Sequence, residues 1–160
     1  MEGPALFQET QRFLKNPWAL FALAAAALGC GAGLFTADAL GNLLHPAGLL
    51  GLVVGGGVSL LLIVGGLHTF VRPDGLYVRL VPITRQHRFE WAEIVSATAC
   101  DYRPIRDYGG WGVRWSREGK AYNVYGSRGV KIELVDGRQV LIGSQHADAL
   151  AMAIASARGA

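Results

Sequence analysis

Hydrophobic residues follow two different patterns along this 160-residue chain. The first half contains long uncharged runs, whereas the second half alternates between apolar and polar positions. No Asp, Glu, Lys or Arg occurs in the 33 residues between Asp38 and Arg72. Two windows, residues 18–37 and 49–70, match the roughly 20 apolar residues that a helix needs to cross a bilayer. The first half therefore predicts a transmembrane helical hairpin.

The residues around these windows predict where the two chain termini lie. The connection 38–48 is rich in Gly and Pro, which favours a reversal of the chain. It contains no Lys or Arg, and the nearest basic residues lie on the other side of the hairpin, at Arg12, Lys15 and Arg72. Basic residues favour the cytoplasmic side of a membrane. We therefore expect a multi-pass protein of the inner membrane, with segment 1–17 and residues 71–160 in the cytoplasm.

Two alternatives and one further property concern the same hairpin. The windows could instead form a buried helical hairpin of a soluble protein, and the first could be a signal peptide. The length of the first window and the second window that follows argue against a signal peptide. The spacing of Gly29 with Gly33 and of Gly51 with Gly55 lets helices approach closely. Self-association through the hairpin is therefore one expected interaction.

The alternation in the second half predicts strands. Segment 76–81, LYVRLV, has a period of two and follows the turn sequence Pro-Asp-Gly. Segment 85–91 predicts a second strand paired with the first, and WAEI, residues 91–94, predicts a helical turn. The pair Asp136-Gly137 predicts a hairpin between segments 129–135 and 138–143.

A helix is predicted after the last strand. Ser144 is a candidate N-cap for a helix through residues 145–157. Its apolar stripe falls at positions spaced by three and four residues, namely Ala147, Leu150, Ala151 and Ile154. Strands followed by one amphipathic helix are typical of a small, partly open β-barrel capped by a helix.

Composition and charge limit the possible chemistry. The chain is 51% hydrophobic and 17% charged, against about 25% charged residues in an average soluble domain. Residues 72–160 carry 13 Lys and Arg and 9 Asp and Glu, so their formal charge is 13 − 9 = +4. The acids are interleaved with the bases, which argues against nucleic acid as a partner. Cys30 and Cys100 are too few for a disulfide framework or a cysteine metal site, and we expect no metal or cofactor.

The segment YRPIRDYGGWGVRW, residues 102–115, concentrates aromatic residues, Arg and Gly. In one interpretation its aromatic rings pack back onto the strands. In a second it contacts a membrane surface, and in a third it contacts a protein partner, because Trp, Tyr and Arg are enriched at interface hot spots. The candidate residues for partner or lipid binding are Arg103, Arg106, Tyr108, Trp111 and Arg114.

Two stretches support a family resemblance. YRPIRDYGGWGVRW and AYNVYGSRGVKIELVDGRQVLIGSQ resemble a group of small bacterial two-pass membrane proteins with a PH-like cytoplasmic domain. The resemblance implies an α+β membrane protein in which a transmembrane hairpin, residues 18–70, precedes a PH-like, partly open β-barrel with a C-terminal helix, residues 71–160.

No HExxH or GxSxG motif suggests an enzyme. We therefore expect a non-enzymatic scaffold or assembly protein whose PH-like domain binds a protein partner at the membrane surface. The alternative is a module that senses anionic lipid.

Overall fold

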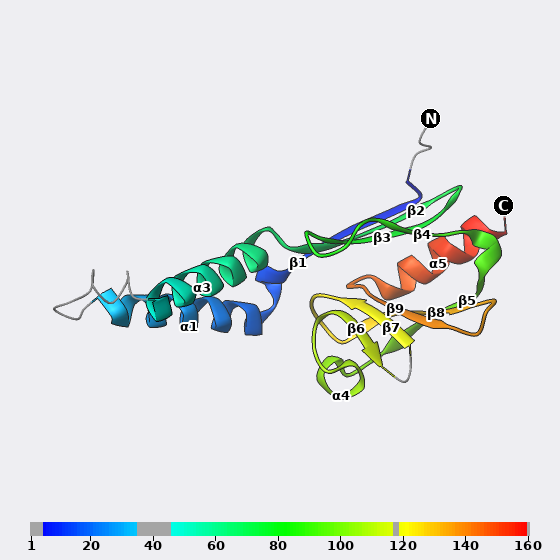
Figure 1. Ribbon diagram of the computed structural model, residues 1–160. Helices are drawn as coiled ribbons and strands as arrows, with labels where there is room; N and C mark the ends of the chain where they lie inside the picture. The colour runs from blue at the N-terminus through cyan, green and yellow to red at the C-terminus, as the bar shows by residue number, and fades with distance from the viewer. Residues whose placement is uncertain (1–4, 35–45, 117–118, 160) are drawn as a thin grey trace.

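The computed structural model describes residues 5–34, 46–116 and 119–159. The chain is a small α+β protein with two β-sheets, a C-terminal helix and a pair of long helices. Figure 1 shows the helical pair extending away from the body that contains the two sheets.

The first sheet is antiparallel and has the strand order β1-β2-β3-β4. Its strands are β1 (Phe7–Arg12), β2 (Gly66–Arg72), β3 (Gly75–Val81) and β4 (His87–Phe89). The strand β1 precedes the helical pair in sequence and β2 follows it, and the two pair from Phe7 with Val71 to Arg12 with Gly66. The helical pair is therefore inserted between two neighbouring strands of one sheet.

The second sheet has the strand order β5-β8-β9-β7-β6, and only its β7–β9 pair is parallel. Its strands are β5 (Ile94–Asp101), β6 (Gly112–Ser116), β7 (Gly119–Asn123), β8 (Arg128–Leu134) and β9 (Gln139–Gly143). The 3-10 helix η2 (Trp91–Glu93) leads from the first sheet into β5, and the short helix α4 (Pro104–Tyr108) connects β5 with β6.

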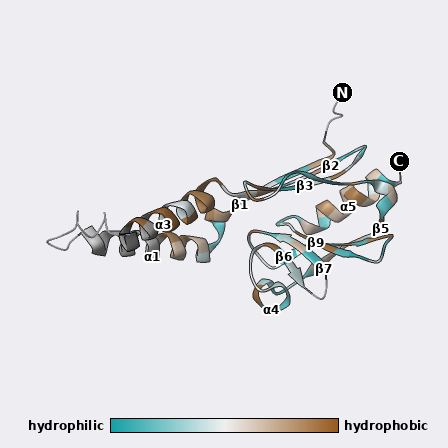
Figure 2. Cartoon of the chain, in the orientation of Figure 1, coloured by the Kyte–Doolittle hydropathy of each residue, from teal (hydrophilic) through white to brown (hydrophobic). Residues whose placement is uncertain are grey.

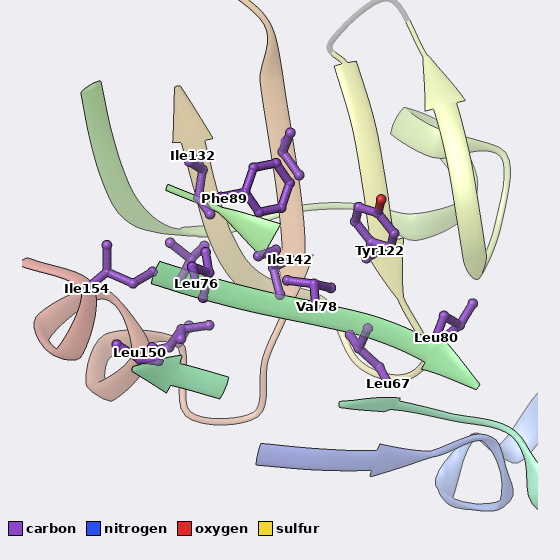
Figure 3. Close-up of a cluster of buried hydrophobic side chains, with 14 of the residues drawn as sticks. Leu67, Leu76, Val78, Leu80, Phe89, Tyr122, Ile132, Ile142, Leu150 and Ile154 are labelled. Carbon is purple, nitrogen blue, oxygen red and sulfur yellow. The ribbon is translucent and has the colours of Figure 1, made fainter. Parts of the chain in front are cut away.

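The core lies between the two sheets and the C-terminal helix α5 (Ala147–Arg158). In Figure 1, α5 lies between the sheets, and it contacts β5 and β8 on one side and β1 and β2 on the other. Leu150 and Ile154 of α5 are fully buried with residues from both sheets, among them Leu76 and Ile132 (Figure 3). This arrangement joins the N-terminal and C-terminal parts of the chain into one body.

Three buried polar side chains near the N-terminus bond to the second sheet and its flanking turns. The Glu9 carboxylate accepts hydrogen bonds from the Ser144 hydroxyl and the Gln145 backbone N–H. The Gln11 side chain donates to the Gly143 carbonyl oxygen at 2.7 Å, and the Asn16 side chain donates to the Val124 carbonyl oxygen at 3.0 Å. We call Glu9, Gln11 and Asn16 the polar clamp, since they fasten the N-terminal segment to the body.

The helical pair consists of α1 (Pro17–Leu34), which follows the 3-10 helix η1 (Phe13–Lys15), and α3 (Pro46–Val64). The two helices contact each other, and Figure 2 shows apolar residues along their described parts. Several large apolar side chains on them are exposed, including Trp18, Leu20, Phe21, Val53, Val54, Val58, Leu60, Ile63 and Val64. The described surface of the pair is therefore strongly apolar.

The prediction of a transmembrane hairpin is wrong. Among the residues that the structure describes, no helix is both long enough and apolar enough to cross a membrane. The second window, residues 49–70, failed because α3 ends at Val64 and residues 66–70 belong to β2. Leu67 and Thr69 are buried in the body, so the lack of charge there reflects a buried strand. The first window, residues 18–37, extends past the end of α1 at Leu34, and residues 35–37 lie outside the described part.

Other parts of the prediction depended on the hairpin. The multi-pass inner-membrane localisation is corrected with it, since its helical spans are not found in the described residues. The connection 38–48 lies largely outside the described residues, and only the helical backbone is described at Gly29, Gly33 and Gly51.

The prediction of one partly open barrel is also corrected, because the strands form two separate sheets. On one side α5 lies between the sheets, and on another a pocket separates β4 from the β6–β7 hairpin. Both features keep the edge strands from pairing into a single barrel.

Several predicted elements are confirmed. The strand 76–81 corresponds to β3, its partner to β4, and the turn at 91–94 to η2. The hairpin at Asp136-Gly137 joins β8 and β9. The stripe of the last helix is confirmed, with Ala147, Leu150 and Ile154 buried and Ala151 partly buried. The N-cap of this helix is His146 rather than Ser144, because the helix begins only at Ala147. The Ser144 hydroxyl donates to Glu9 and accepts a hydrogen bond from the His146 N–H at 3.0 Å.

Candidate binding surface

The segment between β5 and β6 is a short helix with a defined end. Pro104 occupies the start of α4, where its missing N–H costs nothing. The Asp107 carboxylate accepts a hydrogen bond from the Arg103 backbone N–H at 2.7 Å. Gly109 ends the helix at φ 69°, and its N–H and that of Gly110 donate to carbonyl oxygens of the first turn. The segment therefore has a regular backbone, with a glycine at the position that requires a left-handed conformation.

Two tyrosines hold this helix against the second sheet. Tyr102 and Tyr108 are buried, and their rings meet edge to face with centroids 6.0 Å apart. They form a small second core with Ala121 and Leu141, and Cys100 packs at its side. Burial raises the pKa of Tyr102 to about 12, although the nearby Asn123 amide acts in the opposite direction. Tyr108 therefore positions the helix from beneath and is not available for direct contact with a partner.

Asn123 of β7 fixes the return of the segment into β6. Its side chain is fully buried, and its Oδ1 accepts a hydrogen bond from the Gly112 N–H at 3.0 Å. Its Nδ2 donates to the Gly110 carbonyl oxygen at 3.5 Å. Sequence analysis missed Asn123, because it lies eleven residues beyond its partner Gly112 and only the strand pairing brings the two together.

The outward face of the segment carries a mixture of apolar and basic side chains. Arg103, Arg106 and Arg114 are exposed, as the sequence analysis supposed for binding residues. Trp111 is half-buried and packs against the main core. Trp115 is 73% exposed and Ile105 is 62% exposed, although neither was a candidate residue. We call Arg103, Ile105, Arg106 and Arg114 the α4–β6 surface. Trp115 does not belong to it, because side chains alternate along β6 and the Trp115 ring meets Lys120 on the opposite face from Arg114.

An open groove runs beside this surface. It has a volume of about 970 Å³, and α4 lies along it together with the end of β6. Its lining contains both charge signs and two serines, from Asp101, Tyr102, Arg103, Arg106, Asp107, Ser116 and Ser127. Arg128 lies next to the groove and pairs with Asp101 at 3.4 Å. The groove therefore offers both hydrogen-bond donors and acceptors, and its charged side chains are of both signs.

A second pocket lies on the other side of Ser116, between the two sheets. We call it the sheet-gap pocket, and its volume is about 490 Å³. It is lined by the end of β4, the facing ends of β6 and β7, and the β8–β9 turn, through His87, Phe89, Trp115, Ser116, Gly119, Lys120, Leu134, Gly137, Arg138, Gln139 and Val140. Three separate parts of the sequence, around residues 87–89, 115–120 and 134–140, meet here, so the residue pattern alone gave no signal for this pocket.

The described residues offer little for nucleophilic or metal chemistry. Cys100 packs beside the tyrosine pair, and no group of three or more His, Cys, Asp or Glu in the described part of the chain could hold a metal ion. The His68 Nδ1 lies 3.1 Å from the Thr10 hydroxyl, and burial together with Arg79 and Arg12 lowers the pKa of His68.

Comparison with known proteins does not identify a family for this chain. No protein-family model matches this chain, and no curated protein matches it significantly. The resemblance to proteins with a PH-like domain remains a prediction.

Proposed function

We propose that this chain is a non-enzymatic binding protein that recognises a protein partner through the α4–β6 surface. The observation that carries the proposal is the exposure of Ile105 beside three arginines. Single exposed apolar residues are common on proteins, but Arg is enriched among the residues that dominate binding energy.

The support beneath the surface favours binding as well. Tyr102, Tyr108 and Asn123 hold the backbone of α4 and the start of β6. Binding costs free energy when loops and side chains must be ordered, and a surface that is ordered beforehand avoids part of that cost. The two buried tyrosines thus contribute by positioning the exposed arginines and Ile105.

The charges of the neighbouring groove favour a protein partner over an anionic lipid surface. Arg103 and Arg106 share the groove with Asp101 and Asp107. An anionic surface would attract the arginines and repel the carboxylates at nearly the same distance. A protein can instead place a donor opposite each carboxylate and an acceptor opposite each arginine.

Co-purification tests this proposal. The tagged full chain would be expressed in its source cells beside an Ile105→Ala, Arg106→Ala double variant, and bound proteins would be identified by mass spectrometry. The matched control is an Arg79→Ala, Met152→Ala double variant, which removes an arginine and an exposed apolar residue elsewhere.

We expect a protein that co-purifies with wild type and the control and is lost from the α4–β6 variant. Circular dichroism would show that the variant is folded. Identical sets of bound proteins for all three chains would contradict the proposal. Replacement of bound proteins by salt-sensitive binding to anionic lipid would support the lipid-sensing alternative instead.

A further inference from the structure

The sheet-gap pocket combines cations with an apolar floor. Lys120 and Arg138 line it together with His87, and no carboxylate occurs among its described lining residues. Phe89, Leu134 and Val140 supply the floor, and the ring of Trp115 forms an exposed wall. Such a combination suits a ligand with a negative charge next to an apolar group.

The two cations are oriented by their neighbours. The Lys120 Nζ lies 5.1 Å from the ring centroid of Trp115 and 4.7 Å from that of Tyr122, so two aromatic rings hold the ammonium group. The Asp136 carboxylate bonds to the Arg138 Nε and backbone N–H, which fixes the guanidinium above the β8–β9 turn. A ligand therefore meets charges that are already in place.

The pKa of His87 depends on the charges in this pocket. Its pKa is lowered by burial first and by the nearby Lys120 and Arg138, while Glu93 acts in the opposite direction. A positive environment disfavours a further positive charge on the imidazole. An anion bound between Lys120 and Arg138 would offset their effect and raise the pKa of His87.

The pocket also lies at the edge of the first sheet. The strand β4 has three residues and is the last strand in the order β1-β2-β3-β4, so its outer edge faces away from β3. An extended peptide can bind such an edge through its backbone and place alternate side chains into a neighbouring pocket. This geometry favours an extended segment over a compact ligand.

We propose that the sheet-gap pocket binds an acidic, extended peptide segment of the protein partner. A carboxylate of the peptide lies between Lys120 and Arg138, and an adjacent apolar side chain packs against Trp115 and Phe89. The inference rests on the proposed function, because it takes the partner to be a protein, but it concerns a different set of side chains from the α4 arginines.

The experiment uses nuclear magnetic resonance on the full chain with two synthetic peptides. The acidic probe is acetyl-Phe-Glu-Phe-Glu-amide, and the matched neutral probe is acetyl-Phe-Gln-Phe-Gln-amide, which keeps the size and the apolar groups. Binding is followed at the Trp115 indole N–H and the His87 ring, and inorganic phosphate is titrated in a third arm.

We expect the acidic peptide to bind at least roughly tenfold more tightly than the neutral one, and to raise the pKa of His87. Lys120→Gln and Arg138→Gln should each weaken binding of the acidic peptide by roughly tenfold. Arg79→Gln is the matched control, since Arg79 is an exposed cation outside the pocket, and it should change binding less than about twofold. Arg138 is 75% exposed in a turn, so its variant retains the fold even if the Lys120 variant does not.

Three results would overturn the inference: equal binding of the two peptides, unchanged binding in Arg138→Gln, or tighter binding of inorganic phosphate than of the acidic peptide. If the α4–β6 variant loses the co-purified partner and one of these three results is also obtained, the peptide-binding inference fails but the proposed function stands. If no protein partner co-purifies either, the proposed function fails with it.

Discussion

Tyr102 illustrates how burial at a single residue supports the candidate surface. The residue is 6% exposed and its backbone N–H donates to the Ser127 carbonyl oxygen, so both its side chain and its backbone are fixed two positions before α4 begins. Inward packing of Tyr102 and Tyr108 was one interpretation of the sequence, because aromatic residues beside Gly often pack inward. No pattern in the sequence indicates Asn123, whose role depends on strand pairing, and none separates half-buried Trp111 from exposed Trp115.

The raised pKa of Tyr102 predicts a pH dependence of stability. The phenol has a pKa near 10 in the unfolded chain and about 12 in the folded protein. Its contribution is therefore fully present below pH 10 and is lost as pH rises from 10 to 12. Between these values we expect wild type to lose up to about 2.7 kcal/mol more of its unfolding free energy than Tyr102→Phe does.

Urea denaturation of both chains at several alkaline pH values measures this difference. A Tyr125→Phe variant controls for the loss of an ionisable phenol at a site that is less buried. Parallel stability curves for wild type and Tyr102→Phe above pH 10 would contradict the prediction.

At the scale of elements, local patterns found the strands and the helix whose periodicity is visible in the sequence. The strand β3 shows the alternation of one buried face, and α5 shows a buried stripe that includes Leu150 and Ile154. Residues 66–70 were predicted as part of a helix although they belong to β2, because a buried strand and an apolar helix both lack charged residues. The strand β1 was not predicted, because it is stabilised by pairing with β2, which lies more than fifty residues away in the sequence.

The polar clamp predicts that β1 depends on Glu9. Glu9→Ala removes the acceptor for the Ser144 hydroxyl and the Gln145 N–H. Because Ser144 is fully buried, we expect a loss of about 2–4 kcal/mol in the free energy of unfolding. The measurement is chemical denaturation followed by circular dichroism.

The neighbouring residue provides the control for this substitution. Gln8→Ala changes an exposed side chain in the same strand, and we expect an effect within about 0.5 kcal/mol. Equal losses in both variants would show that Glu9 acts through strand propensity rather than through its hydrogen bonds.

At the scale of the whole molecule, the helical pair presents apolar surface that the body does not cover. Exposed side chains such as Val58, Leu60 and Ile63 follow one another along α3. Contiguous apolar surface of more than a few hundred Å² is unusual on a monomeric protein in water and marks an interaction surface. We therefore expect the full chain to self-associate in aqueous buffer through α1 and α3.

Sedimentation velocity measures this self-association. A Val58→Gln, Ile63→Gln variant should shift the distribution toward the monomer, whereas a Val95→Gln, Met152→Gln variant, changed at exposed sites on the body, should behave like wild type. A monomeric wild-type chain at all concentrations would contradict the prediction. The apolar content of these helices was visible in the sequence, but it was interpreted as contact with a membrane.

The position of the helical pair between β1 and β2 also has a consequence for the order of folding. Arg12 must meet Gly66, and closing a loop of this length in a disordered chain costs conformational entropy. Packing of α1 against α3 brings the two ends of the loop together before the strands pair. We therefore expect β1 to pair with β2 once α1 has packed against α3. On the ribosome, the buried Glu9 carboxylate of β1 gains its hydrogen-bond partners only after Ser144 and Gln145 have been synthesised.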